Sequence, residues 1–300
     1  GLREHRWYTG DDDWYHDAYP TVRRIIGWFC QYLNDDGLLE NVPGWIFIDW
    51  ADCHKTGMSS SLNAIFAVAL DVLAEVAEVV GDQRTVDDAK AKAATIREKF
   101  MLTFFDADRG VVMDAVEDGQ FVDKISEHGI ASALFADCVS DDAIEALVNA
   151  AWQDDRWADQ WVECQPFYTR IVLEGMWKVG RTDLAMKVIE QRWGVRFIDR
   201  GHDTCLEEWT CNGSWRFGPW LNIQRTTSHA WSACVSEFLR RRVAGIELLE
   251  PGGAKVRVSP FQADHAYTIT TPLVSGTVTV EHQPGKSPKV TTTGDVEVVA

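Results

Sequence analysis

Apolar residues recur three and four positions apart along most of the first 245 residues, a spacing that predicts amphipathic helices. Residues 21–33 carry such a face, and Pro20 fits a first helical turn because its missing N–H is not needed there. Just upstream, the acidic run 11–13 offers N-cap oxygens after a turn. Residues 61–80 are apolar on nearly every side, which indicates a helix buried between neighbours. Further helices are expected at residues 85–104, 129–138, 141–152, 167–179, 182–192 and 228–243.

The pattern changes after residue 245. Segments 255–258, 266–271, 275–281 and 290–299 alternate, at least in part, between apolar and polar residues and are separated by Gly and Pro. They predict a small antiparallel, sandwich-like β domain over residues 246–300. Residues 1–245 are expected to form about eight helices in antiparallel pairs, joined by alternately short and long connections. This arrangement favours a mainly α fold, an (α/α) toroid whose long loops gather at one end and carry the site.

Two long connections hold the candidate chemistry. In the first, residues 38–60, Asp49 and Trp50 follow an apolar triplet; the alternative is a short buried strand in which Asp49 caps a neighbouring turn. The second connection, residues 193–225, places Glu207 and Glu208 among tryptophans. Indole rings stack on the apolar faces of sugars, and carboxylates move protons or bind hydroxyls. The sequence therefore predicts a carbohydrate site.

Composition narrows the class of ligand. The 29 basic and 46 acidic residues give a formal net charge of −17, which argues against nucleic acid and anionic membrane surfaces as partners. No apolar run approaches the ~20 residues of a membrane helix, and no secretory signal is visible. The seven cysteines show neither a CxxC pair nor zinc-ligand spacing. We expect buried thiols in a reducing, cytoplasmic compartment and neither a metal nor a cofactor.

An ordered series of short motifs runs through the chain. It comprises Phe47-Ile48-Asp49-Trp50, Ser61-Leu62-Asn63-Ala64-Ile65-Phe66, Pro166-Phe167, Leu173-Glu174, Gly180-Arg181, Trp193-Gly194, Thr204-x-x-Glu207, Ser228-His229-Ala230-Trp231-Ser232-Ala233 and Glu250-Pro251-Gly252. With this series the chain resembles the bacterial α-L-rhamnosidases of glycoside hydrolase family 78. The resemblance covers nearly the whole chain and implies an (α/α)6 barrel with a C-terminal β domain, which removes terminal α-L-rhamnose with inversion.

The resemblance also implies roles for particular residues. An inverting enzyme pairs a protonated carboxyl with a second carboxylate that activates water, the two standing ~6.5–9.5 Å apart. The family's general base is the Glu of a Thr-Thr-x-Trp-Glu segment, which aligns with Glu207, although Leu206 replaces the usual Trp. Glu208 is the competitor, because a shift of one residue exchanges the two.

Substrate contacts are expected around this base. Asp49 and Trp50 match the family's sugar-binding loop, and His229 matches a histidine near the sugar, although a structural role is equally open for His229. Glu127 and His128 open a predicted helix that faces the cleft, with capping as the alternative. Each of three tryptophans is either a stacking platform or part of the core: Trp193, Trp209 and Trp231.

The family's general acid belongs to an Asp-Cys-Pro-x-Arg-x-Glu-Arg-like segment that this sequence does not contain. Glu4 has a faint likeness to its end, which we interpret as accidental. A closed ring of six helix pairs needs about twelve helices, against about eight predicted. We therefore expect an N-terminal part with the acid to precede these 300 residues. Two alternatives stay open: another sugar-active enzyme on the same toroid (a different glycosidase, an unsaturated uronyl hydrolase or an epimerase), and a non-catalytic sugar-binding protein.

Overall fold

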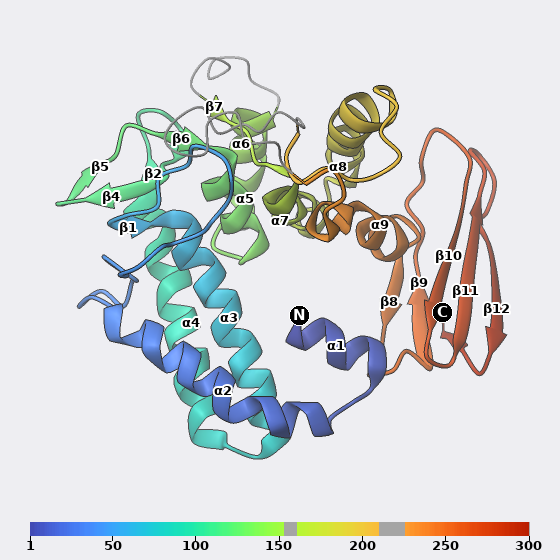
Figure 1. Cartoon of the computed structure of the whole chain (residues 1–300), viewed down its shortest axis with the longest axis horizontal. Coiled ribbons are helices and arrows are strands. Elements are labelled where there is room, and N and C mark those ends of the chain that lie inside the picture. The colour runs from blue at the N-terminus through green and yellow to red at the C-terminus, as the bar shows by residue number, and fades with distance from the viewer. Residues whose placement is uncertain (153–160, 210–225, 300) are drawn as a thin grey trace. The chain divides into compact units, whose positions relative to one another are not determined.

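The computed structural model describes residues 1–152, 161–209 and 226–299 (Figure 1). They form two compact units. One unit consists of Gly1–Thr21, Val76–Asp82 and Val235–Ala300, and the other consists of Val22–Glu75 and Gln83–Cys234. Every candidate site residue belongs to the second unit. The predicted domain boundary at residue 245 stays a prediction.

Helices predominate up to residue 245 and strands follow, which confirms the predicted fold class. The described α-helices are α1 Leu2–Thr9, α2 Asp13–Phe29, α3 Ser60–Val80, α4 Gln83–Phe104, α5 Glu127–Phe135, α6 Asp141–Trp152, α7 Pro166–Lys178, α8 Thr182–Ile189 and α9 Cys234–Phe238. Helix α8 continues as a π-helix over Glu190–Ile198, a 3₁₀ turn covers Ala230–Ala233, and α9 continues as a π-helix over Leu239–Val243. Short strands lie between the helices: β1 Met58–Ser59, β2 Phe105–Asp106, β3 Val111–Val112, β4 Ala115–Glu117, β5 Gln120–Phe121, β6 Ile125–Ser126 and β7 Trp161–Val162.

The start of α2 differs from the sequence prediction. The helix begins at Asp13, not at residue 21, and Pro20 lies inside it. The acidic run 11–13 does supply the cap, because Asp11 Oδ1 accepts the N–H of Trp14 at 3.1 Å. Because the cap lies upstream, the helix can begin before Pro20. Proline has no backbone N–H, so one hydrogen bond within the helix is missing at Pro20.

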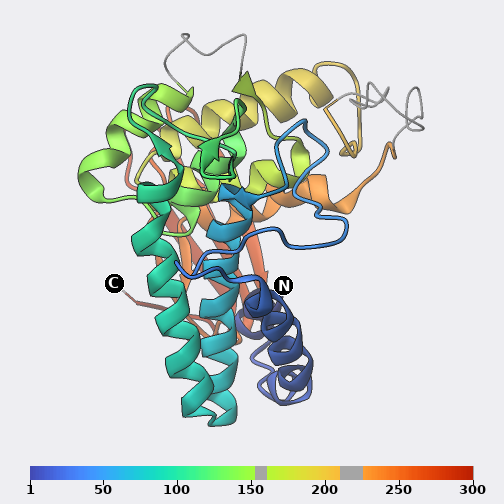
Figure 2. The same cartoon turned by 90° about the vertical axis from the view of Figure 1, so that its left-hand side faces the viewer.

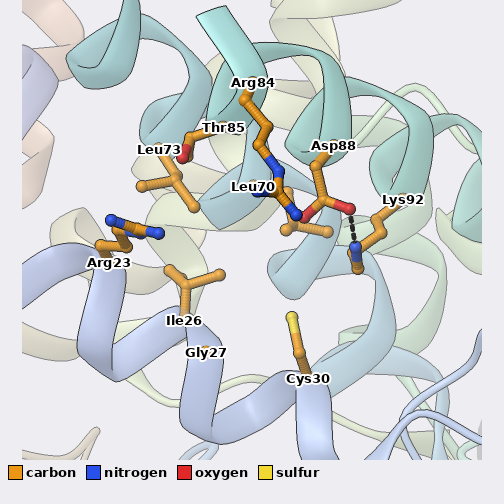
Figure 3. A pocket seen from close by; sticks show the side chains of 10 residues that line it. All are labelled: Arg23, Ile26, Gly27, Cys30, Leu70, Leu73, Arg84, Thr85, Asp88 and Lys92. Atoms are coloured by element: carbon orange, nitrogen blue, oxygen red, sulfur yellow. Dashed lines mark hydrogen bonds and ion pairs between the residues drawn. The ribbon is translucent and has the colours of Figure 1, made fainter. Parts of the chain in front are cut away.

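Helices α3 and α4 run side by side in both views (Figures 1 and 2). An ion pair joins them where Arg97 Nη2 donates to Asp71 Oδ2, while Arg97 Nε donates to the carbonyl of Ala136 after α5. Together with α2 they line an open cavity of about 380 Å³. Its apolar side chains come from Ile26, Leu70 and Leu73 and its charged ones include Arg23, Arg84, Asp88 and Lys92 (Figure 3). None of the candidate site residues lines this cavity.

The two helices that begin at the candidate site, α5 and α7, pack very closely. A Cβ atom added at Gly175 of α7 would lie 3.0 Å from the carbonyl oxygen of Ala131 and 3.2 Å from Cβ of Leu134, both on α5. Glycine at position 175 therefore permits the close approach of α7 to α5.

The C-terminal strands form two three-stranded sheets with a common core. The bounds are β8 Ile246–Leu248, β9 Lys255–Val258, β10 Tyr267–Leu273, β11 Gly276–His282, β12 Lys289–Gly294 and β13 Glu297–Val299. One sheet has the order β10-β11-β12 and is antiparallel, as predicted. The other has the order β13-β9-β8, and β13 pairs with β9 in parallel, which the alternating pattern could not show. Buried Val256, Val278 and Val280 lie in the core between them.

Two further expectations concern the cysteines and membrane-spanning helices. Six cysteines in the described ranges are free, three of them buried; Cys211 lies outside those ranges, as does the part of the second long connection from residue 210 to 225. No helix in the described ranges is long and apolar enough to cross a membrane.

Candidate active site

Glu207 lies half-buried at the centre of the candidate site. Its Oε1 accepts the indole N–H of Trp50 at 3.0 Å, and its Oε2 accepts the backbone N–H of Thr226 at 3.0 Å. Burial on its own raises the pKa of Glu207, but the bonds from Thr226 and Trp50 and the nearby charge of His229 outweigh it and hold this pKa below its ordinary value. The carboxylate is therefore ionised at neutral pH, as a base must be.

Glu208 is placed differently from its neighbour. Its side chain is 0% exposed, whereas that of Glu207 reaches the surface of the site. Leu206, on the other side of Glu207, is also buried. This alternation directs Glu207 alone of the three toward solvent, and a carboxylate that activates water has to reach water. The geometry favours Glu207 over Glu208 as the base.

Two of the three candidate tryptophans, Trp193 and Trp209, lie in the interior. Trp193 and Trp209 meet edge to face, with ring centroids 4.9 Å apart. Their indole N–H groups donate to the carbonyl oxygens of Ser232 and Cys164, respectively, at 2.8 and 2.7 Å. Both rings therefore belong to the core. Of the three candidate tryptophans, Trp231 is then the one that could stack on a sugar.

Trp231 is the centre of an aromatic cluster beside Glu207, defined by Phe47, Trp50, Phe167 and Trp231. The ring of Trp231 lies 4.9 Å from that of Phe167 and stacks almost parallel to that of Phe47 at 5.9 Å. Its indole N–H donates to the Glu207 carbonyl at 3.2 Å. Phe167 is 37% exposed, so one end of the cluster meets solvent. Neither Phe47 nor Phe167 was predicted from the sequence as a site residue, although both belong to the ordered series of motifs.

His229 supports Trp231. The two rings stack with centroids 4.1 Å apart, and His229 Nδ1 accepts the backbone N–H of Trp231 at 3.4 Å. The backbone N–H of His229 donates to the carbonyl of Cys205, which ties this turn to the segment that carries Glu207. His229 thus combines a structural contact with a position close to Glu207.

Asp49 and His128 form a fully buried pair beneath the site. Asp49 Oδ2 lies 2.8 Å from His128 Nε2 and accepts the backbone N–H of Gln165 at 2.7 Å. Both side chains are 0% exposed. On the other ring nitrogen, His128 Nδ1 lies 3.1 Å from Ser126 Oγ. These bonds give Asp49 a structural role, and its predicted place in a sugar-binding loop stays a prediction.

Glu127 lies in a second buried set of charges. It forms an ion pair with Arg192 and accepts the N–H of Cys164 at 2.8 Å and the indole N–H of Trp152 at 2.7 Å. Burial on its own raises the pKa of Glu127, but the Arg192 charge and these donors outweigh it and lower the pKa below its usual value. Glu163 continues the set, since it lies 3.5 Å from Arg192 Nε. These bonds make Glu127 part of the support of the site.

Among the residues that the structure describes, one group of side chains could reach a metal ion. Oxygen, nitrogen and sulfur atoms of Asp49, His128 and Cys164 lie within 4.8 Å of one another. However, Asp49 Oδ2 is already bonded to His128 and Gln165, and burial raises the pKa of the Cys164 thiol well above its ordinary value. This arrangement favours a hydrogen-bonded cluster over a metal centre.

Comparisons with known proteins agree with this picture. The model of the bacterial alpha-L-rhamnosidase six-hairpin glycosidase domain matches residues 4–243. A rhamnosidase of family GH78 from Bacillus sp. GL1 is similar over 99% of this chain and 32% of its own, with 23% identity and a TM-score of 0.85. An α-L-rhamnosidase from Streptomyces avermitilis, solved with L-rhamnose, is similar over 94% of this chain and 26% of its own, with 20% identity and a TM-score of 0.71. The chain thus spans about a third or less of the length of these structures. No curated protein sequence matches it.

Proposed function

This chain belongs to the bacterial α-L-rhamnosidases with a six-hairpin glycosidase domain, and we propose that the whole protein hydrolyses terminal α-L-rhamnosides of glycosides or polysaccharides with inversion. The observation that carries the proposal is Glu207: a half-exposed carboxylate with a lowered pKa, held between two N–H donors beside an aromatic cluster. Ionised carboxylate and aromatic surface are the two features that water activation and sugar binding require.

In the proposed mechanism Glu207 removes a proton from a water molecule as the water oxygen attacks the anomeric carbon. The bond from that carbon to the leaving oxygen breaks, and a protonated carboxyl delivers a proton to the leaving oxygen. The products are L-rhamnose of inverted configuration and the free aglycone.

The cluster of Phe47, Trp50, Phe167 and Trp231 is proposed to bind the sugar. Its rings come from three separate segments and meet beside Glu207. Neutral indole and phenyl faces suit the apolar face of a deoxysugar, which carries a methyl group. A rhamnosyl glycoside is therefore the proposed partner; the net charge of −17 disfavours nucleic acid and anionic membranes. The free thiols of the described cysteines support a cytoplasmic location.

The stereochemical outcome tests this function. The whole protein is incubated with an aryl α-L-rhamnoside, and the first anomer released is followed by proton NMR before mutarotation. We expect β-L-rhamnose first. A first product of α configuration would contradict inversion, and hydrolysis confined to other glycosides in a glycan panel would favour a different sugar-active enzyme of the same fold.

A further inference from the structure

A continuous series of hydrogen bonds runs from the buried interior to Glu207. It starts at Asp114, whose Oδ1 lies 2.6 Å from Ser126 Oγ. Ser126 Oγ lies 3.1 Å from His128 Nδ1, and His128 Nε2 lies 2.8 Å from Asp49 Oδ2. All four side chains are buried, and they come from β6, α5 and two connections.

The hydrogen-bond pattern fixes the direction of the His128–Asp49 bond. Asp49 accepts backbone N–H groups at both oxygens, that of Gln165 at Oδ2 and that of Trp50 at Oδ1, both within 2.8 Å. This is the pattern of an ionised carboxylate, so His128 Nε2 donates. His128 thereby supplies the side-chain donor to a carboxylate that has been removed from water, and without it two backbone groups alone would hold the charge.

Asp49 is joined to Glu207 through a single residue. The next residue, Trp50, donates its backbone N–H to Asp49 and its indole N–H to Glu207. Lys55 closes the same loop, because its Nζ donates to the Asp49 carbonyl at 2.8 Å. The orientation of the Trp50 ring therefore depends on where Asp49 is held.

We propose that His128 is a positioning residue of the active site: it anchors Asp49, and Asp49 aims the Trp50 indole N–H at Glu207. The inference rests on the proposed function only in calling Glu207 the base; the coupling itself is a property of the fold. The groups that face His128 are Asp49, Tyr168, Cys164 and, through Ser126, Asp114. Besides Trp50 and Thr226, the group that acts on the Glu207 charge is His229.

The test measures the pKa of Glu207 directly, by ¹³C NMR of carboxyl-labelled glutamate in the full chain, with Glu207→Gln used to assign the signal. Trp50→Phe removes one neutral donor from a half-exposed carboxylate, which is expected to raise this pKa by about half to one unit. His128→Leu is expected to raise it by a similar amount. In the double variant the two effects should not add, because both act through the same bond.

Two further variants separate anchoring from general damage. Asp49→Asn keeps the shape of the side chain, removes its charge and is expected to shift the pKa of Glu207 in the same direction, which gives a second test where His128→Leu does not fold. His54→Gln removes a histidine of the same loop that bonds to exposed Glu117, and it should leave the Glu207 pKa unchanged. Additive shifts in the double variant, or an unshifted Glu207 in a folded His128 or Asp49 variant, would overturn the proposal.

The readout does not depend on turnover. If Glu207→Gln remains active while the NMR shifts occur, the base assignment fails and the positioning role stands. If Glu207→Gln is inactive and the shifts are missing, the base assignment stands and the positioning role fails.

Discussion

From the buried ion pair between Glu127 and Arg192 we predict how far a substitution lowers the free energy of unfolding. Glu127 is 1% exposed, and its two oxygens accept N–H groups from Arg192, Trp152 and Cys164. The substitution Glu127→Gln keeps the shape but removes the charge that faces Arg192. Removing one partner of a buried pair typically costs about 3–5 kcal/mol. Since Glu163 still lies 3.5 Å from Arg192 Nε, we expect the lower end, about 3 kcal/mol.

The pH dependence of this loss has a defined sign. The folded-state pKa of Glu127 lies below its ordinary value of 4.5, so the ion pair stabilises the fold above that value and its contribution disappears as pH falls through the folded-state pKa. The difference between wild type and Glu127→Gln should therefore be largest near pH 7 and shrink below about pH 4.5.

Urea denaturation followed by circular dichroism, repeated from pH 7 down to pH 4, measures this difference. The control is Asp183→Asn, which removes an exposed pair with Arg181 and is expected to cost no more than about 1 kcal/mol. A loss below about 1 kcal/mol for Glu127→Gln at pH 7, or a loss that persists unchanged in acid, would refute the reasoning.

The remaining predictions concern packing and sugar binding. Gly175→Ala pushes a Cβ atom toward the carbonyl oxygen of Ala131 and should lower the free energy of unfolding by about 1–3 kcal/mol, as measured by thermal unfolding. In the control, Gly27→Ala, the new Cβ meets no atom within 4 Å, so the free energy of unfolding should stay the same or rise by up to about 1 kcal/mol. Equal effects of the two substitutions would contradict the close contact between α5 and α7. Trp231→Ala should weaken binding of L-rhamnose to the whole protein at least about tenfold by calorimetry. Trp28→Ala, an exposed tryptophan of α2, should not, and unchanged affinity in Trp231→Ala would remove the cluster from the sugar site.

The sequence predicted the helices well because helix periodicity is local. The start of α2 was wrong because caps compete: Pro20 and the acidic run both signal a beginning, and the hydrogen bond from Trp14 to Asp11 shows that the earlier signal prevails. The parallel pairing of β13 with β9 joins residues far apart in the chain, and no alternation within either strand encodes it.

For the candidate site, the sequence selected segments that the structure brings together, but it did not distinguish the roles of their side chains. Trp193 and Trp209 cannot be told from Trp231 by composition; their burial depends on contacts with residues more than 30 positions away. The choice between Glu207 and Glu208 likewise needed the alternation around Leu206, which only the folded segment shows.

The sequence revealed only two of the four side chains in the buried hydrogen-bond series beneath the site. Asp49 and His128 were both selected, but as separate sugar contacts, because 79 positions separate them in the chain. Ser126 and Asp114, which complete the series, carry no motif at all. Hydrogen-bond partners of this kind are set by tertiary packing, so a single sequence cannot reveal them.

The central claim is that Glu207 activates the attacking water. The most direct measurement is the kcat of Glu207→Gln in the whole protein on an aryl α-L-rhamnoside, with Glu208→Gln in parallel and Glu117→Gln, an exposed carboxylate that accepts bonds from Thr56 and His54, as control. We predict that kcat falls about a hundredfold or more for Glu207→Gln, with KM little changed, and stays near wild type for the control. A fall of less than about tenfold, roughly 1.4 kcal/mol of barrier, would contradict the claim.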